Sequence, residues 1–155
     1  MESTVNTAIE YLRLVTCHID RADPPGVIMA ILLELGFSPD SEGFNYLCEA
    51  IELKVNDRKL HLSEIYQAIE GRYDSSMGYF QIDQAIRSVI KSAWIGRKEE
   101  KWIKLFSAFT QETEKRPSNF KFICYVTCLV ILLKYDHSWH PFGFFTPPGN
   151  GREFL

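Results

Sequence analysis

The chain has 155 residues, of which 46% are hydrophobic and 24% are charged, and its formal net charge is −3. This length corresponds to about one domain with an ordinary hydrophobic core, and the charge argues against a uniformly basic nucleic-acid binder. The longest apolar run, 122–133, is too short to cross a bilayer, and Met1 is not followed by a secretory signal. We therefore expect a cytoplasmic protein with no membrane segment.

The cysteines indicate reduced thiols, because they lie in helical patterns and lack the density of a disulfide-rich secreted scaffold. They are Cys17, Cys48, Cys124 and Cys128. A zinc site of Cys124, Cys128, His137 and His140 can be drawn, but its spacing is not that of a usual zinc finger. Cysteines in an apolar helix act as small hydrophobes instead. We expect neither a metal nor another cofactor.

Helical spacing of apolar residues dominates the chain, whereas the alternation typical of strands is rare, so the sequence predicts an all-α fold. Helices are expected over 3–20, 27–35, 44–55, a short stretch after Ser63, 76–96, 102–109 and 120–134. Pro24 and Pro25 are expected to end the first of these helices, and Gly36 the second. Ser63 and Ser118 are candidate N-caps.

The helix predicted over 76–96 has two different faces. Its apolar face, suited to a core, consists of Ile82, Ile86, Val89, Ile90 and Ala93. Gln84, Arg87, Ser88 and Lys91 form a polar stripe on the other side, with groups that suit base edges and phosphates. A short helix and a Gly/Ser-containing turn come before it, which is the layout of a helix-turn-helix.

Charge is distributed unevenly along the chain. Residues 1–79 hold 6 Lys/Arg and 13 Asp/Glu, whereas residues 80–125 hold 9 Lys/Arg and 5 Asp/Glu. The basic residues are thus concentrated in and after the helix with the polar stripe, as expected where a mostly acidic protein contacts a phosphate backbone.

The last predicted helix, from Phe120 to about Lys134, is apolar on most sides. A small domain can hardly cover such a helix alone, so either the N-terminal helix or a second protomer should pack on it. The tail over 136–155 has no periodicity and is expected to be irregular.

Several segments resemble one family, the C-terminal DNA-binding effector domain of the stage-zero response regulator that initiates sporulation in endospore-forming Firmicutes. The segments are LLELGF (32–37), GFNYLCEAIELKVND (43–57), IYQAIEGRY (65–73), IDQAIRSVIKSAW (82–94), LFSAF (105–109) and KRPSNFKFI (115–123). They occur in the order found in the family. The pattern AIR-x3-I-x2-AW, followed by RPSN-x2-FI, is much more specific than a generic helix-turn-helix.

The resemblance implies a six-helix, all-α helix-turn-helix domain over 27–135, preceded by an N-terminal helical extension over 1–26 and followed by the irregular tail. It also implies that the helix over 76–96 enters the major groove of double-stranded DNA. The predicted base contacts are Asp83, Gln84, Arg87 and Ser88. The predicted phosphate contacts are Lys91, Arg97, Lys98 and Lys101.

The chain departs from the family pattern at the centre of the recognition helix. The family uses an acid followed by an arginine, with a second arginine one turn later, and the matching positions here are Asp83, Gln84 and Arg87. Only the second arginine is retained, so the DNA site should differ from the usual one or be bound more weakly. A receiver domain does not fit before Val27, so control by phosphorylation is not expected.

The leading interpretation is a sequence-specific transcription regulator of the sporulation-initiation type. The alternative is a degenerate effector-like domain that binds DNA weakly or not at all and acts through contacts with the regulator or the transcription machinery. For both interpretations, the protein partners considered are a second copy of the chain and a full-length sporulation regulator. No spacing typical of a catalytic site is present, and His18 and His61 are isolated, so an enzyme is not expected.

Overall fold

The computed structural model describes residues 4–73 and 78–136, which form seven α-helices and no strand. The helices are α1 (Thr4–Val15), α2 (Pro24–Glu34), α3 (Glu42–Asn56), α4 (Leu62–Arg72), α5 (Tyr79–Ile95), α6 (Glu99–Phe106) and α7 (Asn119–Lys134). The predicted all-α class is confirmed. The sequence predicted six helices for the domain and one before it, and the described residues hold seven in all. The tail over 137–155 lies outside the described residues.

The two prolines were assigned to the wrong side of a helix boundary. Helix α1 already ends at Val15, and Pro24 and Pro25 occupy the first turn of α2. A proline is tolerated there because the N–H groups of a first turn have no intrahelical acceptor. Gly36 ends α2 as predicted, with a φ of 96°, and the Phe37 N–H donates to the Leu32 carbonyl.

The predicted N-caps had different outcomes. The Ser118 hydroxyl accepts from the Lys121 N–H and begins α7, as expected. Ser63, in contrast, lies inside α4, which begins one residue earlier, at Leu62. The Glu64 carboxylate accepts from the His61 N–H at 2.8 Å and thereby stabilises this helix start.

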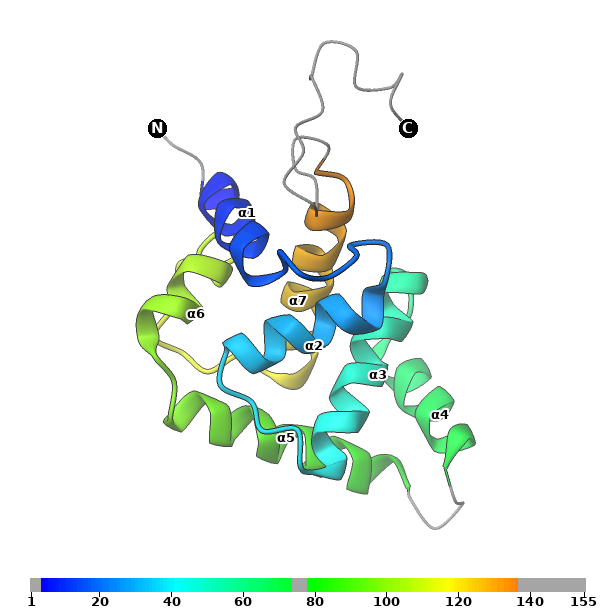
Figure 1. The fold of residues 1–155 in the computed structure, drawn as a ribbon. Coiled ribbons are helices and arrows are strands. Elements are labelled where there is room, and N and C mark those ends of the chain that lie inside the picture. Colours follow the sequence, from blue (N-terminus) through cyan, green and yellow to red (C-terminus); the bar gives the residue numbers. More distant parts are fainter. Residues whose placement is uncertain (1–3, 74–77, 137–155) are drawn as a thin grey trace.

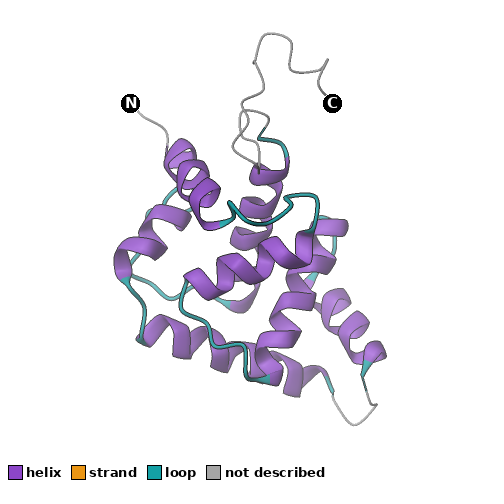
Figure 2. Ribbon diagram, viewed as in Figure 1, coloured by secondary structure: helices purple, strands orange, loops and turns teal. Residues whose placement is uncertain are grey.

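Helix α3 lies at the centre of the fold and packs against α2, α4, α5 and α7 (Figures 1 and 2). Its contact with α5 is close because Gly43 has no side chain. A Cβ atom at this position would lie 2.4 Å from the Ala85 carbonyl oxygen, so any larger residue would force the two helices apart. Gly43 therefore helps to set the position of α5, which runs along one edge of the molecule (Figure 1).

Helix α1 packs on α2, α6 and α7 and is part of the core. Ala8 and Leu12 are fully buried. At its edge, the Tyr11 hydroxyl donates to the Glu34 carboxylate, and Lys101 Nζ lies 3.1 Å from the same group. Burial by itself raises the pKa of Glu34, but these two partners outweigh it and hold the pKa below its ordinary value. Residues of α1, α2 and α6 thus meet around one carboxylate.

The end of α7 is also joined to the N-terminal part of the chain. Arg13 Nε donates to an Asp136 carboxylate oxygen at 2.8 Å, and Arg21 lies 3.5 Å from the same oxygen. Leu129, Val130 and Leu133 of α7 are buried within the chain. Helix α7 is therefore covered within the chain by α3 and, to a lesser extent, by α1, α2 and α5, and self-association remains a prediction.

Candidate nucleic-acid interface

Helix α5 is held in place by its apolar face. Ile82, Ile86, Ile90 and Ala93 are at most 5% exposed, as the sequence pattern predicted, and Val89 is half-buried. The helix begins after Gly78, whose N–H donates to the Gln81 side chain at 3.2 Å. These contacts determine which side of α5 faces away from the core.

The outward side of α5 carries four residues at positions i, i+4, i+7 and i+11, which we call the outer stripe. They are Phe80, Gln84, Arg87 and Lys91, and all are exposed. The stripe extends over about 16 Å, because each helical residue advances by about 1.5 Å. Ser88 is exposed beside it. The predicted Gln84, Arg87, Ser88 and Lys91 therefore share one accessible face.

Asp83 is placed differently from the other predicted base contacts. One of its carboxylate oxygens accepts from the Tyr66 hydroxyl at 2.8 Å and from Asn119 Nδ2 at 3.0 Å. The second oxygen accepts from an Arg87 guanidinium nitrogen at 2.7 Å. Asp83 thus connects α4, α5 and α7 and orients Arg87 on the outer stripe. Its predicted contact with a base remains a prediction.

The hydroxyl of Tyr66 is kept in its protonated, donating form. Burial raises the pKa of Tyr66, and although the Asn119 hydrogen bond opposes this shift, the Asp83 carboxylate adds to it. Asn119 itself is 7% exposed and donates to the Tyr66 hydroxyl at 3.2 Å and to the Asp83 carbonyl at 3.0 Å. The three residues form one hydrogen-bonded network beneath Arg87.

Tyr66→Phe removes one hydroxyl from this network and should lower the free energy of unfolding by about 1.5 to 3 kcal/mol, because one of the lost hydrogen bonds goes to a carboxylate. Urea denaturation measures the change. Tyr125→Phe is the control, because within the described residues no hydrogen bond of the Tyr125 hydroxyl is found. Equal losses in the two variants would contradict a role for Tyr66 in the network.

The predicted phosphate contacts beyond α5 lie in three different environments. The Arg97 guanidinium lies over the Trp94 ring, with its Cζ atom 3.6 Å from the ring centroid, and it donates to the Trp94 carbonyl at 2.8 Å. Lys98 is exposed at the start of α6. Lys101 pairs with Glu34 of α2 and so takes part in the junction with α1. Lys98 also lies close enough to Glu34 to contribute to the lowering of its pKa, so Lys98 and Lys101 share this neighbour, whereas Arg97 is held at Trp94.

The fold places beside α5 several residues that were not predicted from the sequence as contacts. Arg87 of α5 and Arg116 of the α6–α7 connection line one hollow of about 280 Å³, together with Ser118 and Asn119. Phe80, which is 69% exposed, was also missed. Its spacing of four residues from Gln84 was a usable signal. For Arg116 the signal was only its place in the segment KRPSNFKFI.

Within the described ranges, no three His, Cys, Asp or Glu side chains are grouped so that they suit a metal ion. All four cysteines carry free thiols. His137 and His140, which complete the zinc set considered from the sequence, lie outside these ranges. None of the described helices combines the length and apolar character that a bilayer crossing requires.

Comparison with known proteins identifies the family. No solved structure matches the chain. The family model described as "Sporulation initiation factor Spo0A C terminal" matches residues 28–129, which is more than half of the chain and includes all of α3 to α6. That family consists of DNA-binding domains of transcription factors and is not a family of enzymes. The chain therefore belongs to the family of Spo0A C-terminal domains of sporulation initiation factors.

Proposed function

We propose that this protein is a sequence-specific DNA-binding transcription regulator of the sporulation-initiation type, acting in the cytoplasm. Helices α4 and α5 serve as its helix-turn-helix, and α5 enters the major groove. The observation that carries this proposal is the outer stripe, which places Phe80, Gln84, Arg87 and Lys91 together on an exposed face of a helix fixed by the core. An α-helix fits the major groove, where each base pair presents a distinct pattern.

Each polar residue of the outer stripe has a preferred partner on DNA. Gln84 suits adenine, whose N6 and N7 its amide can span, and Arg87 suits guanine O6 and N7. Asp83 binds one guanidinium nitrogen of Arg87 and leaves other N–H groups free to donate to a base. Lys91 and Ser88 lie where they suit the neighbouring phosphates or base edges.

Positive charge near α5 supplies the second part of the interface. Arg116 lies beside Arg87, and Lys98 is exposed after the C-terminal end of α5. Cations at these places contact phosphates, which position the protein on DNA without reading the sequence. Arg97 and Lys101 were predicted for the same role, and each needs to exchange an internal partner for a phosphate.

The test is selection of DNA sites from a random library with the purified protein, followed by titration of the selected site against a scrambled one. We expect tighter binding to the selected site, and a steep loss of affinity for both as salt is raised. If no sequence is enriched at low salt, the alternative applies: a domain that acts through contacts with a sporulation regulator or the transcription machinery. The Asp83–Arg87 ion pair, at 2.7 Å, favours this alternative if it holds Arg87 away from bases.

The phenyl ring of Phe80 is exposed on the outer stripe and suits the 5-methyl group of thymine. We therefore expect the protein to prefer thymine at the DNA position that faces Phe80. Replacing the contacted thymine by uracil removes one methyl group and should weaken binding by about 0.8 kcal/mol. Phe80→Ala should cause a similar loss and should be insensitive to that replacement. Uracil at positions away from the stripe is the control. An equal effect at every thymine would contradict the contact.

A further inference from the structure

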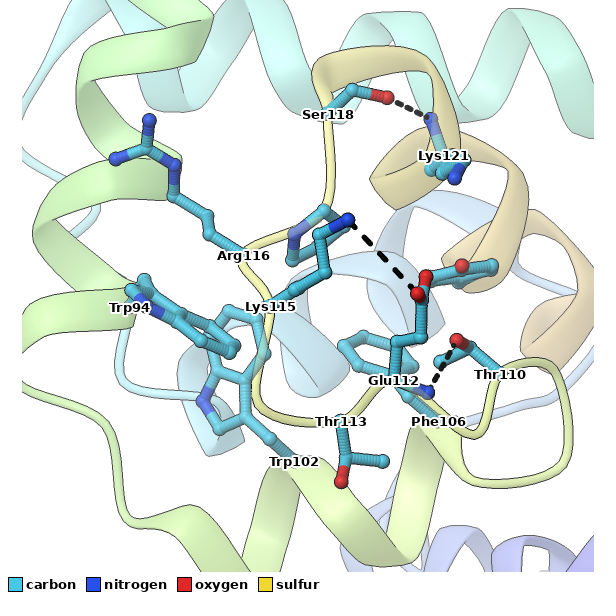
Figure 3. A pocket seen from close by; sticks show the side chains of 12 residues that line it. Trp94, Trp102, Phe106, Thr110, Glu112, Thr113, Lys115, Arg116, Ser118 and Lys121 are labelled. Carbon is cyan, nitrogen blue, oxygen red and sulfur yellow. Dashed lines mark hydrogen bonds and ion pairs between the residues drawn. The ribbon is translucent and has the colours of Figure 1, made fainter.

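A cleft behind the C-terminal half of α5 has the construction of a small-molecule site. It has a volume of about 230 Å³ and lies between α5, α6, the α6–α7 connection and the start of α7 (Figure 3). Its aromatic floor consists of Trp94, Trp102, Phe106 and Tyr125. Small ligands bind in concave sites that combine aromatic and apolar side chains with polar groups, and the other residues that line this cleft are mostly polar or charged.

The floor is rigid, because its rings are fixed from below. Trp102 and Phe106 are 2% and 4% exposed, and their rings meet edge to face with centroids 5.5 Å apart. Trp94 meets Trp102 in the same way at 5.4 Å. The Trp102 indole N–H donates to the Leu35 carbonyl at 3.1 Å, which ties the ring to the end of α2. A bound ring therefore requires little reorganisation of the protein.

The rim of the cleft is basic in a protein whose net charge is −3. Its lining holds three cations, Lys115, Arg116 and Lys121, and one acid, Glu112, which gives these residues a net charge of +2. Lys115 reaches across the cleft towards Glu112 (Figure 3), but the two charges are 4.0 Å apart and largely exposed. Such a pair is weak and is easily exchanged for a stronger partner. An anion is attracted to this rim and not to the acidic remainder of the surface.

We propose that this cleft binds a small aromatic anion, with a planar ring system on the floor and a phosphate or carboxylate at Lys115 and Lys121. The volume suits one fused pair of rings, which is smaller than a drug-sized ligand. Aromatic rings gain edge-to-face contacts with the floor. The N-terminal end of α7, next to Lys121, adds favourable electrostatics for the anion.

The position of the cleft couples it to DNA, a consequence that rests on the function proposed above. Arg116 and Ser118 line both this cleft and the hollow that contains Arg87. An anion in the cleft neutralises cations next to the DNA-binding surface. Ligand binding should then weaken DNA binding, and DNA should weaken ligand binding by the same factor.

The binding test uses three probes with the full chain: 1-naphthyl phosphate, 1-naphthol and inorganic phosphate. Nuclear magnetic resonance follows the indole N–H signals of Trp94 and Trp102, which are assigned from Trp→Phe variants. We expect 1-naphthyl phosphate to shift both signals and to bind at least about tenfold more tightly than either of the other probes, because a charged hydrogen bond adds to ring burial. Equal affinities for 1-naphthyl phosphate and 1-naphthol, or unshifted indole signals, would overturn the proposal.

Substitutions of residues that line the cleft test whether 1-naphthyl phosphate binds there. Lys115→Ala and Lys121→Ala should each weaken binding of 1-naphthyl phosphate about two- to fivefold, and the double variant about tenfold. Lys59→Ala, an exposed lysine between α3 and α4, is the matched control and should change nothing. Thr113→Phe, at the wall of the cleft, should abolish binding of both naphthyl probes, with thermal melting as the check on folding. Equal losses from Lys59→Ala and Lys121→Ala would overturn the assignment of the cleft.

A competition experiment tests the coupling. Saturating 1-naphthyl phosphate should release bound DNA, whereas inorganic phosphate at the same ionic strength should not. If 1-naphthyl phosphate and inorganic phosphate release the same amount of DNA, the effect is a general effect of salt and the proposed coupling is wrong. If the protein binds 1-naphthyl phosphate but no DNA, the proposed function fails and the ligand site stands.

Discussion

Arg87→Ala should weaken binding to the preferred DNA site by about 1 to 3 kcal/mol and relax the preference at one base pair. Arg87 is exposed on the outer stripe, and Asp83 fixes its orientation at 2.7 Å. An oriented guanidinium loses less entropy when it forms two hydrogen bonds to guanine. Competitive titration against sites altered at each position measures both effects.

Lys98→Ala is the control for electrostatics. This substitution removes an exposed cation at the start of α6. It should therefore lower the affinity for all DNA sequences by the same factor and make the salt dependence of binding less steep. If Arg87→Ala also lowers the affinity for all DNA sequences by the same factor, Arg87 contacts a phosphate and not a base.

Gln84→Arg is a gain-of-function test on the same stripe. It restores the pair of arginines that the family resemblance implies, so the preference should shift from adenine towards guanine at one position. Gln84 is exposed, so the longer side chain meets no packing obstacle in the core. If both the natural protein and Gln84→Arg bind every sequence equally, the major-groove proposal fails.

Leu12→Ala should lower the free energy of unfolding by about 2 to 5 kcal/mol, the range observed when a buried leucine is truncated and leaves a cavity. Leu12 lies in α1, outside the residues that the family model matches, yet it is fully buried. Leu14→Ala is the matched control on the same helix. Leu14 is 73% exposed, so its truncation should change stability by no more than about 0.5 kcal/mol.

Urea denaturation of both variants separates two roles for α1. A large loss in Leu12→Ala alone means that α1 is part of the folded core. Equal small losses would mean that α1 leaves the domain readily and is free to bind a partner. Removal of residues 1–20 should then leave the melting temperature unchanged, whereas a core role requires a marked decrease.

Most helices and their apolar faces were predictable from the sequence, and the errors lie at the boundaries. Ile82, Ile86 and Ile90 are buried as predicted, because helical periodicity places them on one face. Pro24 and Pro25 were assigned to the end of α1 and in fact begin α2. A proline pair interrupts a helical pattern in either case, so the local sequence does not distinguish the two positions.

The accessibility of Gln84, Arg87 and Lys91 was also predictable, because these residues lie opposite the apolar face of the same helix. The partners of the ionic groups were not. Lys101 was predicted to contact phosphate and pairs with Glu34, while Arg97 stacks on Trp94. Long cationic side chains take the partners that the fold brings within their reach, and neighbours in the sequence do not reveal them.

The sequence by itself determined the all-α class, the family and the exposed stripe of α5, because these depend on residue type and on neighbours within a few turns of helix. Only the tertiary structure decided the role of Asp83, the docking of α1 and the cleft above Trp102. Tyr66 and Asn119 are 53 positions apart and meet at Asp83, and Trp102 reaches Leu35 across 67 positions. Such contacts form only after the helices pack, because each of them requires a particular crossing angle and separation between two helices.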